Sequence, residues 1–135
     1  MNTFDCFITH SIIYQISLLL FSLYIPTAPP DPVSNINHDV SDTSVTITWT
    51  TSFDGFSPIT HIEIEVFQDD ELIQGPLRFS PSQPSARITG LEPSSNYTLM
   101  IYAVNAVGRS LPVRVTIMTL HFGKFISFIP EMTDL

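Results

Sequence analysis

Apolar and polar residues alternate along several short runs between positions 30 and 120. In residues 44–50, valine, isoleucine and tryptophan occupy every second position and threonines lie between them. Because successive side chains of a strand point to opposite faces, this pattern predicts a half-buried antiparallel strand. The longest such run is 97–105, whose core face we expect to carry Tyr97, Leu99, Ile101 and Ala103.

Five further runs predict the remaining strands: 33–36, 62–66, the short edge 72–73, 86–91 and 113–119. Turn residues separate these runs, and residues 75–84, with three prolines, predict a loop or a broken edge. In the 62–66 run both glutamates, Glu63 and Glu65, are predicted on the solvent side. Seven short strands at regular spacing predict an all-β, seven-stranded β-sandwich of the immunoglobulin-like type.

Four residues are predicted to form the structural centre of this sandwich. Trp49 is a single large ring that can fill the middle of a small two-layered fold. Leu91, Pro93 and Tyr97 form the pattern of a tyrosine corner, in which the tyrosine ring is buried and its hydroxyl bonds a backbone group of the turn before it.

These features, in this order, resemble the fibronectin type III domain. The likeness rests on Pro30-Asp31-Pro32-Val33 at the start, Trp49, the Leu91-x-Pro93-x-x-x-Tyr97 corner, and the 97–105 strand with the loop after it. One departure is Ile62, where the family often has an aromatic residue in strand C; the change keeps an apolar core position. The resemblance implies a sheet of strands A-B-E packed on a sheet of strands C′-C-F-G.

The resemblance and the composition together predict three segments. Residues 29–120 are the fibronectin type III-like domain, 1–28 a hydrophobic helical signal peptide or membrane anchor, and 121–135 a C-terminal tail. Residues 6–25 carry no formally charged side chain and could tether the chain to a membrane. Three interpretations stay open for this segment: a cleaved signal peptide, an uncleaved anchor, or an artefact of an incomplete gene model.

Charge and cysteine content narrow the function classes. The formal net charge is −8, and the five basic residues are scattered, so the sequence disfavours nucleic-acid binding. Cys6, the only cysteine, lies outside the predicted domain, which therefore has no internal disulfide. The four histidines lack metal-ligand spacing, and there is no phosphate loop or nucleophile elbow. We expect no catalytic residue, cofactor, metal or small-molecule substrate, and no enzyme activity.

Two places are candidate contacts for a protein partner. Arg109, in the loop 106–112, is predicted as a solvent-facing tip; the alternative is an ordinary connecting loop. Met100, Tyr102 and Val104 form an apolar stripe on the outer face of the 97–105 strand. The alternative for that stripe is cross-strand packing, with Arg114 lying over Tyr102.

Asn96-Tyr97-Thr98 is an N-glycosylation sequon whose asparagine should point outward. The resemblance implies a non-catalytic binding or spacer module of an adhesion molecule or receptor, extracellular or membrane-anchored, with an unidentified protein partner. The alternatives are a purely structural spacer from a larger protein and an accessory domain of a secreted enzyme.

Overall fold

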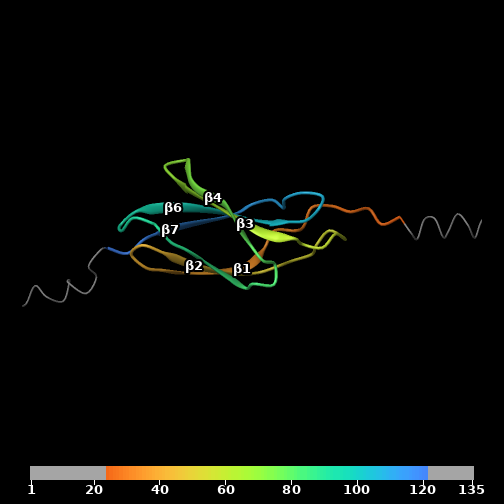
Figure 1. Ribbon diagram of the computed structural model, residues 1–135, viewed down its shortest axis with the longest axis horizontal. Coiled ribbons are helices and arrows are strands. Elements are labelled where there is room, and N and C mark those ends of the chain that lie inside the picture. Colours follow the sequence, from red (N-terminus) through yellow and green to blue (C-terminus); the bar gives the residue numbers. More distant parts are fainter. Residues whose placement is uncertain (1–23, 122–135) are drawn as a thin grey trace, which may run out of the picture.

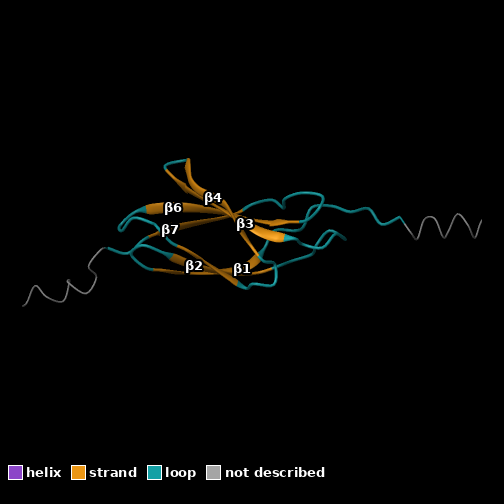
Figure 2. Ribbon diagram, viewed as in Figure 1, coloured by secondary structure: helices purple, strands orange, loops and turns teal. Residues whose placement is uncertain are grey.

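The computed structural model describes residues 24–121, which form seven strands in two packed layers (Figure 1). Loops alone connect the strands (Figure 2), and no helix within this range is long and apolar enough to cross a membrane. The predicted N-terminal segment 1–28 is described only at residues 24–28, which form no helix. The rest of that segment, including most of the predicted tether 6–25, and the predicted tail 121–135 beyond its first residue lie outside the described residues. The described ends of the chain lie at opposite ends of the sandwich.

The two sheets have the predicted composition. The first contains β1 (Ser34–Val40), β2 (Val45–Thr50) and β5 (Ser85–Ile88) in the order β1-β2-β5. The second contains β3 (His61–Gln68), β4 (Glu71–Phe79), β6 (Asn96–Val104) and β7 (Val113–Met118) in the order β4-β3-β6-β7. All pairings are antiparallel. The predicted all-β sandwich with sheets A-B-E and C′-C-F-G is confirmed.

The core lies between the sheets and is built from the alternating positions of each strand. Trp49 is 6% exposed, and its ring lies against Phe79 of the other sheet with 6.3 Å between centroids. Burial of this apolar surface is the largest favourable contribution to folding. The other buried apolar residues are Val33, Val45, Ile47, Ile62, Ile64, Val66, Ala86, Ile88, Leu91, Tyr97, Leu99, Ile101, Ala103 and Ile117.

The tyrosine corner closes the turn before β6. The backbone N–H of Glu92 donates a hydrogen bond to the Tyr97 hydroxyl at 2.8 Å, and the Tyr97 ring is buried. Leu91 is also buried, while Pro93 is only half-buried. The hydroxyl therefore satisfies a backbone donor that the turn itself leaves without a partner.

The prediction for the chain after residue 72 is wrong in part. A nine-residue edge strand, β4, replaces the short edge 72–73 and the first half of the expected loop. Gly75 allows this path, because its φ is +115° and an added Cβ would lie 2.8 Å from the Ile64 carbonyl oxygen. Pro76 is compatible with β4 because an edge strand pairs on one side only. The first strand is likewise longer than predicted and ends at Val40.

Candidate functional site

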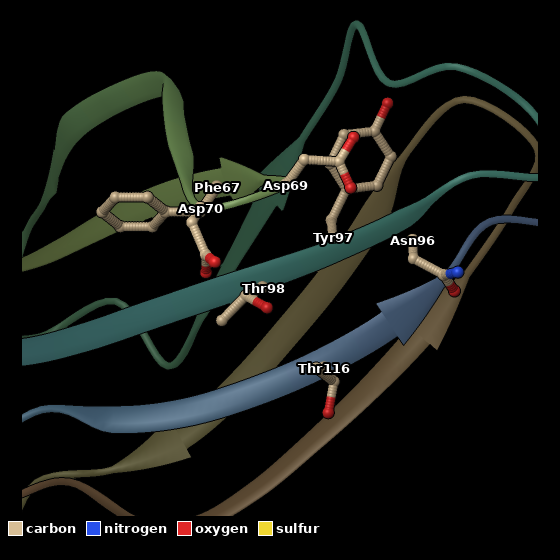
Figure 3. A pocket seen from close by; sticks show the side chains of 7 residues that line it. All are labelled: Phe67, Asp69, Asp70, Asn96, Tyr97, Thr98 and Thr116. Carbon is tan, nitrogen blue, oxygen red and sulfur yellow. The ribbon is translucent and has the colours of Figure 1, made fainter.

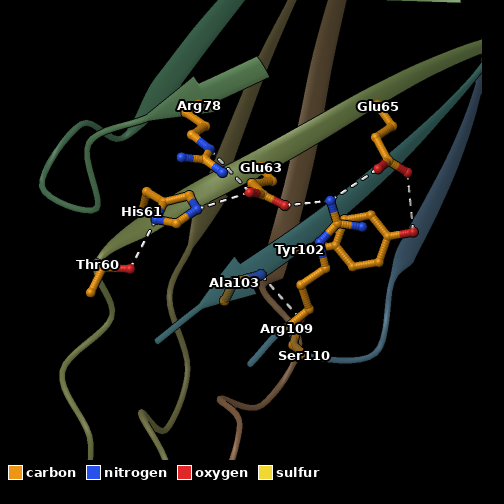
Figure 4. Close-up of polar contacts among 9 residues, drawn as sticks. All are labelled: Thr60, His61, Glu63, Glu65, Arg78, Tyr102, Ala103, Arg109 and Ser110. Carbon is orange, nitrogen blue, oxygen red and sulfur yellow. Dashed lines mark hydrogen bonds and ion pairs between the residues drawn. The ribbon is translucent and has the colours of Figure 1, made fainter. Parts of the chain in front are cut away.

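The outer face of the four-stranded sheet carries a group of charged and aromatic side chains that the strand register brings together. Glu63 of β3 lies opposite Tyr102 of β6, and Glu65 lies opposite Met100. Antiparallel partners share a face, so these four side chains all point away from the core. Figure 4 shows Arg109, from the loop after β6, lying over this face.

Arg109 joins both carboxylates and the aromatic ring. One of its terminal guanidinium nitrogens lies 2.6 Å from Glu63 Oε2 and 3.0 Å from Glu65 Oε1. Its Cζ lies 4.6 Å from the centroid of the Tyr102 ring, within the range of a cation–π contact. The Tyr102 hydroxyl donates a longer hydrogen bond, 3.5 Å, to Glu65 Oε2. We call Glu63, Glu65, Tyr102 and Arg109 the arginine cluster.

The loop before β7 aims Arg109 at the sheet. Ser110 donates its backbone N–H to the Ala103 carbonyl and accepts the Ala103 N–H on its Oγ, at 2.8 and 3.0 Å. Val104 and Arg109 form an isolated antiparallel bridge. The loop thus folds back along β6, so Arg109 is exposed to solvent as predicted but lies over the sheet instead of at a free loop tip. Its side chain is 39% exposed.

Glu63 is the buried centre of the cluster, contrary to its predicted position in solvent. Its side chain is 5% exposed. Oε1 accepts from His61 Nε2 at 3.0 Å and from Arg78 Nε at 3.2 Å, while Oε2 faces Arg109. The Arg109 contact is an ion pair by distance without hydrogen-bond alignment, which leaves Oε2 without a donor among the described residues. Two hydrogen-bond donors, His61 and Arg78, and the charge of Arg109 compensate for removing this carboxylate from water.

The charge states follow from these contacts. Burial alone would raise the pKa of Glu63, but the His61 hydrogen bond and the Arg109 charge outweigh it and hold this pKa below its ordinary 4.5. Burial and the Glu65 charge raise the pKa of the Tyr102 hydroxyl. Burial opposes the charge of Arg109, yet Glu63 and Glu65 raise its pKa above the ordinary value. Glu63 is therefore a carboxylate and Arg109 a guanidinium near neutral pH, while the Tyr102 hydroxyl keeps its proton.

Glu63 should make stability depend on acid pH. Since its folded pKa is depressed, its contribution is complete above the unfolded value of 4.5 and is lost as the pH falls through the folded pKa. We expect Glu63→Gln to flatten this part of the stability profile, measured by urea unfolding from about pH 7 to about pH 3. Glu71→Gln, at an exposed carboxylate on β4, is the control and should leave the profile unchanged. A Glu63→Gln profile as steep as that of the unmodified chain would contradict this assignment.

The other predicted contact residues lie on the same face but outside the cluster. Met100 is opposite Arg114 on β7, and Val104 is opposite His61; both are half-buried. The guanidinium over Tyr102 belongs to Arg109, so the predicted packing of Arg114 on that ring is wrong. Of the four predicted contact residues, the structure brings Arg109 and Tyr102 together.

Sequence reasoning missed Asn105, which holds three segments at one end of the sandwich. It is 4% exposed. Its amide Nδ2 donates to the carbonyls of Ala28 and Asp54 at 2.7 and 2.9 Å, and its Oδ1 accepts from the N–H groups of Val107 and Gly108. The short loop bonds follow an Asx-turn pattern that a sequence can suggest. The hydrogen bonds to Ala28 and Asp54 join residues 77 and 51 positions apart in the sequence, so only the folded structure reveals them.

His61 and Arg78 were also missed as partners of Glu63. Arg78 lies in a segment that the sequence predicts as a loop. The pairing of β3 with β4 sets Arg78 directly opposite Glu63. Within residues 24–121, no group of three histidine, cysteine, aspartate or glutamate side chains is placed to hold a metal ion. The arginine cluster offers an ordered cation, an aromatic ring and hydrogen-bonding groups, which suit recognition of another surface.

The sequence model of the fibronectin type III domain matches residues 29–118. The human cell adhesion molecule DSCAM is 39% identical over 87 residues, which cover 62% of this chain and 4% of that protein. Chicken cell adhesion molecule DSCAML1 is 36% identical over 95 residues, covering 67% of this chain and 5% of that protein. The chain therefore spans only a small part of these relatives' length.

Solved structures agree with the fold. The extracellular domains d3-d4 of rat CD45 superpose with a TM-score of 0.61 at 21% identity, covering 69% of this chain and 51% of that chain. The FN1-FN3 domains of chicken CNTN1 give a TM-score of 0.60 at 18% identity, covering 69% and 33%. At such identities the likeness concerns architecture. With the strand order, the tyrosine corner and the match over residues 29–118, the chain belongs to the fibronectin type III domain family.

Proposed function

We propose that this domain is a non-catalytic module of an extracellular or membrane-anchored adhesion protein and binds a protein partner through the arginine cluster. The observation that carries the proposal is Arg109, which two carboxylates and an aromatic ring hold in place while 39% of its side chain stays exposed. The similarity to cell adhesion molecules supports the extracellular setting and the class of partner.

The Arg109 side chain is already ordered before a partner binds, and this favours binding at the arginine cluster. A flexible arginine loses rotamer freedom when a partner immobilises it, a cost of about 0.5–1.5 kcal/mol per side chain. Arg109 has already lost much of that freedom to Glu63 and Glu65. Arginine and tyrosine are also the residue types that most often dominate binding energy at protein interfaces. A partner that adds an acceptor to Arg109 would therefore bind without ordering it anew.

The runner-up function is a spacer, and the placement of the two described ends at opposite ends of the sandwich favours it. A spacer needs a stable core and a defined length, and it needs no exposed recognition residue. The two functions differ in what the loss of Arg109 does to binding.

Arg109→Ala should abolish most of the binding. The full chain, as multimers, is tested against cell-surface ectodomains that include the chain itself. We expect Arg109→Ala to weaken binding at least about tenfold, the size of a typical hot-spot loss. Arg87→Ala is the matched control, because Arg87 is exposed on β5 of the opposite sheet. Thermal unfolding of each variant shows whether it is folded. Undiminished binding by folded Arg109→Ala, or no binding by any form, would contradict the proposal and favour the spacer.

A further inference from the structure

A groove lies on the same outer face at the opposite end of β6 from the arginine cluster. It has a volume of about 180 Å³ and is lined by Phe67, Asp69, Asp70, Asn96, Thr98 and Thr116, with Tyr97 at its base (Figure 3). Phe67 lies opposite Thr98, and Thr98 lies opposite Thr116, so these three side chains form one row across β3, β6 and β7. Asn96 is exposed and precedes Thr98 by two residues, which puts it on the same face.

The turn between β3 and β4 supplies the acidic wall of this groove. Asp69 and Asp70 have φ values of +51° and +64°, the positive values of a two-residue type I′ hairpin turn. Both side chains are exposed at the groove, beside the half-buried Phe67 ring. The groove thus combines an apolar ring, two carboxylates and two hydroxyls. An amphipathic ligand with several hydroxyl donors matches this lining.

The residues at the groove also form a chemical acceptor. Asn96-Tyr97-Thr98 is an N-glycosylation sequon. The structure places its asparagine in solvent, and within residues 24–121 no side-chain hydrogen bond holds the Asn96 amide. Tyr97, between the two sequon residues, points into the core, so modification of Asn96 leaves the tyrosine corner intact.

We propose that Asn96 carries an N-linked glycan and that its first N-acetylglucosamine residue occupies this groove. In the transfer, Asn96 Nδ2 forms a bond to the anomeric carbon of a lipid-linked diphosphate sugar donor. The bond from that carbon to the diphosphate breaks, the lipid diphosphate leaves with the electron pair, and Nδ2 gives up one proton. The apolar face of the sugar packs on the Phe67 ring, and its hydroxyls donate to the Asp70 carboxylate.

The two ends of the outer face would then have separate roles. Asn96 and Tyr102 are six positions apart on β6, about 20 Å at the usual rise of a strand. A glycan at Asn96 is bulky and solubilising, and it therefore covers the end of the face that carries Asp69 and Asp70. It leaves the arginine cluster open to a partner. This inference rests on the extracellular location contained in the proposed function, and it is independent of the contact through Arg109.

The modification is tested by intact mass of the full chain made in a eukaryotic host. The chain is expressed with its own N-terminus and, separately, behind an unrelated secretion signal. We expect a glycan mass on both forms, lost in Asn96→Gln and in Thr98→Val and kept in Thr98→Ser. No glycan on the chain forced through the secretory route would overturn the inference and leave the contact through Arg109 untouched. A glycan on the forced chain alone would overturn it for the native protein, together with the extracellular location.

The groove is tested by thermal unfolding of three forms of the full chain from one host: fully glycosylated, trimmed to a single sugar, and unmodified because donor synthesis was inhibited. We expect the single sugar to raise the unfolding midpoint by about 4 °C or more, as much as the full glycan does. Phe67→Ala should remove this rise. Phe53→Ala, at an exposed ring in the loop before β3, should retain it. Two results would contradict the placement of the sugar in the groove. The first is an equal rise of the unfolding midpoint in Phe67→Ala, and the second is no rise in the chain that keeps Phe67.

Discussion

Trp49→Ala is expected to remove about 3–5 kcal/mol from the free energy of unfolding, the usual cost of deleting a buried large aromatic side chain. Trp49 is 6% exposed and lies against Phe79 across the two sheets, so truncation opens a void that neither sheet can fill without moving. Since domains are stable by about 5–15 kcal/mol, the loss should bring the protein close to unfolding at ambient temperature. Circular dichroism in urea measures it, because Trp49 is the only tryptophan and the variant has no indole fluorescence.

Tyr97→Phe is the matched comparison for Trp49→Ala. It keeps the buried ring and deletes the hydroxyl that accepts the Glu92 N–H, a loss of about 1 kcal/mol. We expect Tyr97→Phe to lower the urea midpoint by a small amount and Trp49→Ala to lower it several times as much. Similar losses in the two variants would contradict the central place given to Trp49.

Asn105→Ala is expected to have the second largest effect, a loss of about 3 kcal/mol or more. Deleting the amide leaves the Ala28 and Asp54 carbonyls and the Val107 and Gly108 N–H groups without their partner. Each buried polar group left unsatisfied costs about 1–3 kcal/mol, although water can reach part of this loop region and reduce the sum. The measurement is the free energy of unfolding from urea titration.

Asn105→Asp separates hydrogen bonding from side-chain size. The carboxylate keeps the shape and the acceptor for the loop N–H groups, but it puts an oxygen where Nδ2 faces the Ala28 and Asp54 carbonyls. We expect this variant to be at least as unstable as Asn105→Ala. Asn37→Ala, at an exposed position on β1, is the control and should stay within about 0.5 kcal/mol of the unmodified chain. An Asn105→Asp variant of normal stability would refute the role of the amide donors.

Local pattern predicted most of the fold. The alternation in β2 and β6 identified the buried faces, because one side of each strand must leave water and the other need not. The prediction of β4 failed since proline and glycine weaken a strand signal regardless of position. An edge strand tolerates both, and only the completed sheet shows that Glu71–Phe79 is an edge.

The candidate surface was predicted only in part. Arg109 and Tyr102 were identified as exposed candidates, but their contact depends on the loop folding back through Ser110 and Val104. Glu63 appeared to be an ordinary solvent-facing glutamate, because strand alternation separates inside from outside and says nothing of neighbours above the sheet. The three basic side chains around it come from positions 61, 78 and 109, which the register and the loop bring together.

A double-mutant cycle of Arg109→Ala and Glu63→Gln, measured as free energies of unfolding, tests most directly whether the sheet fixes Arg109 through Glu63 before any partner binds. If it does, the two substitutions are coupled by about 1 kcal/mol or more, and the coupling falls as salt is added because the pair is partly exposed to solvent. Effects that add within about 0.5 kcal/mol would show that Arg109 is a free loop side chain and would contradict a preformed arginine cluster.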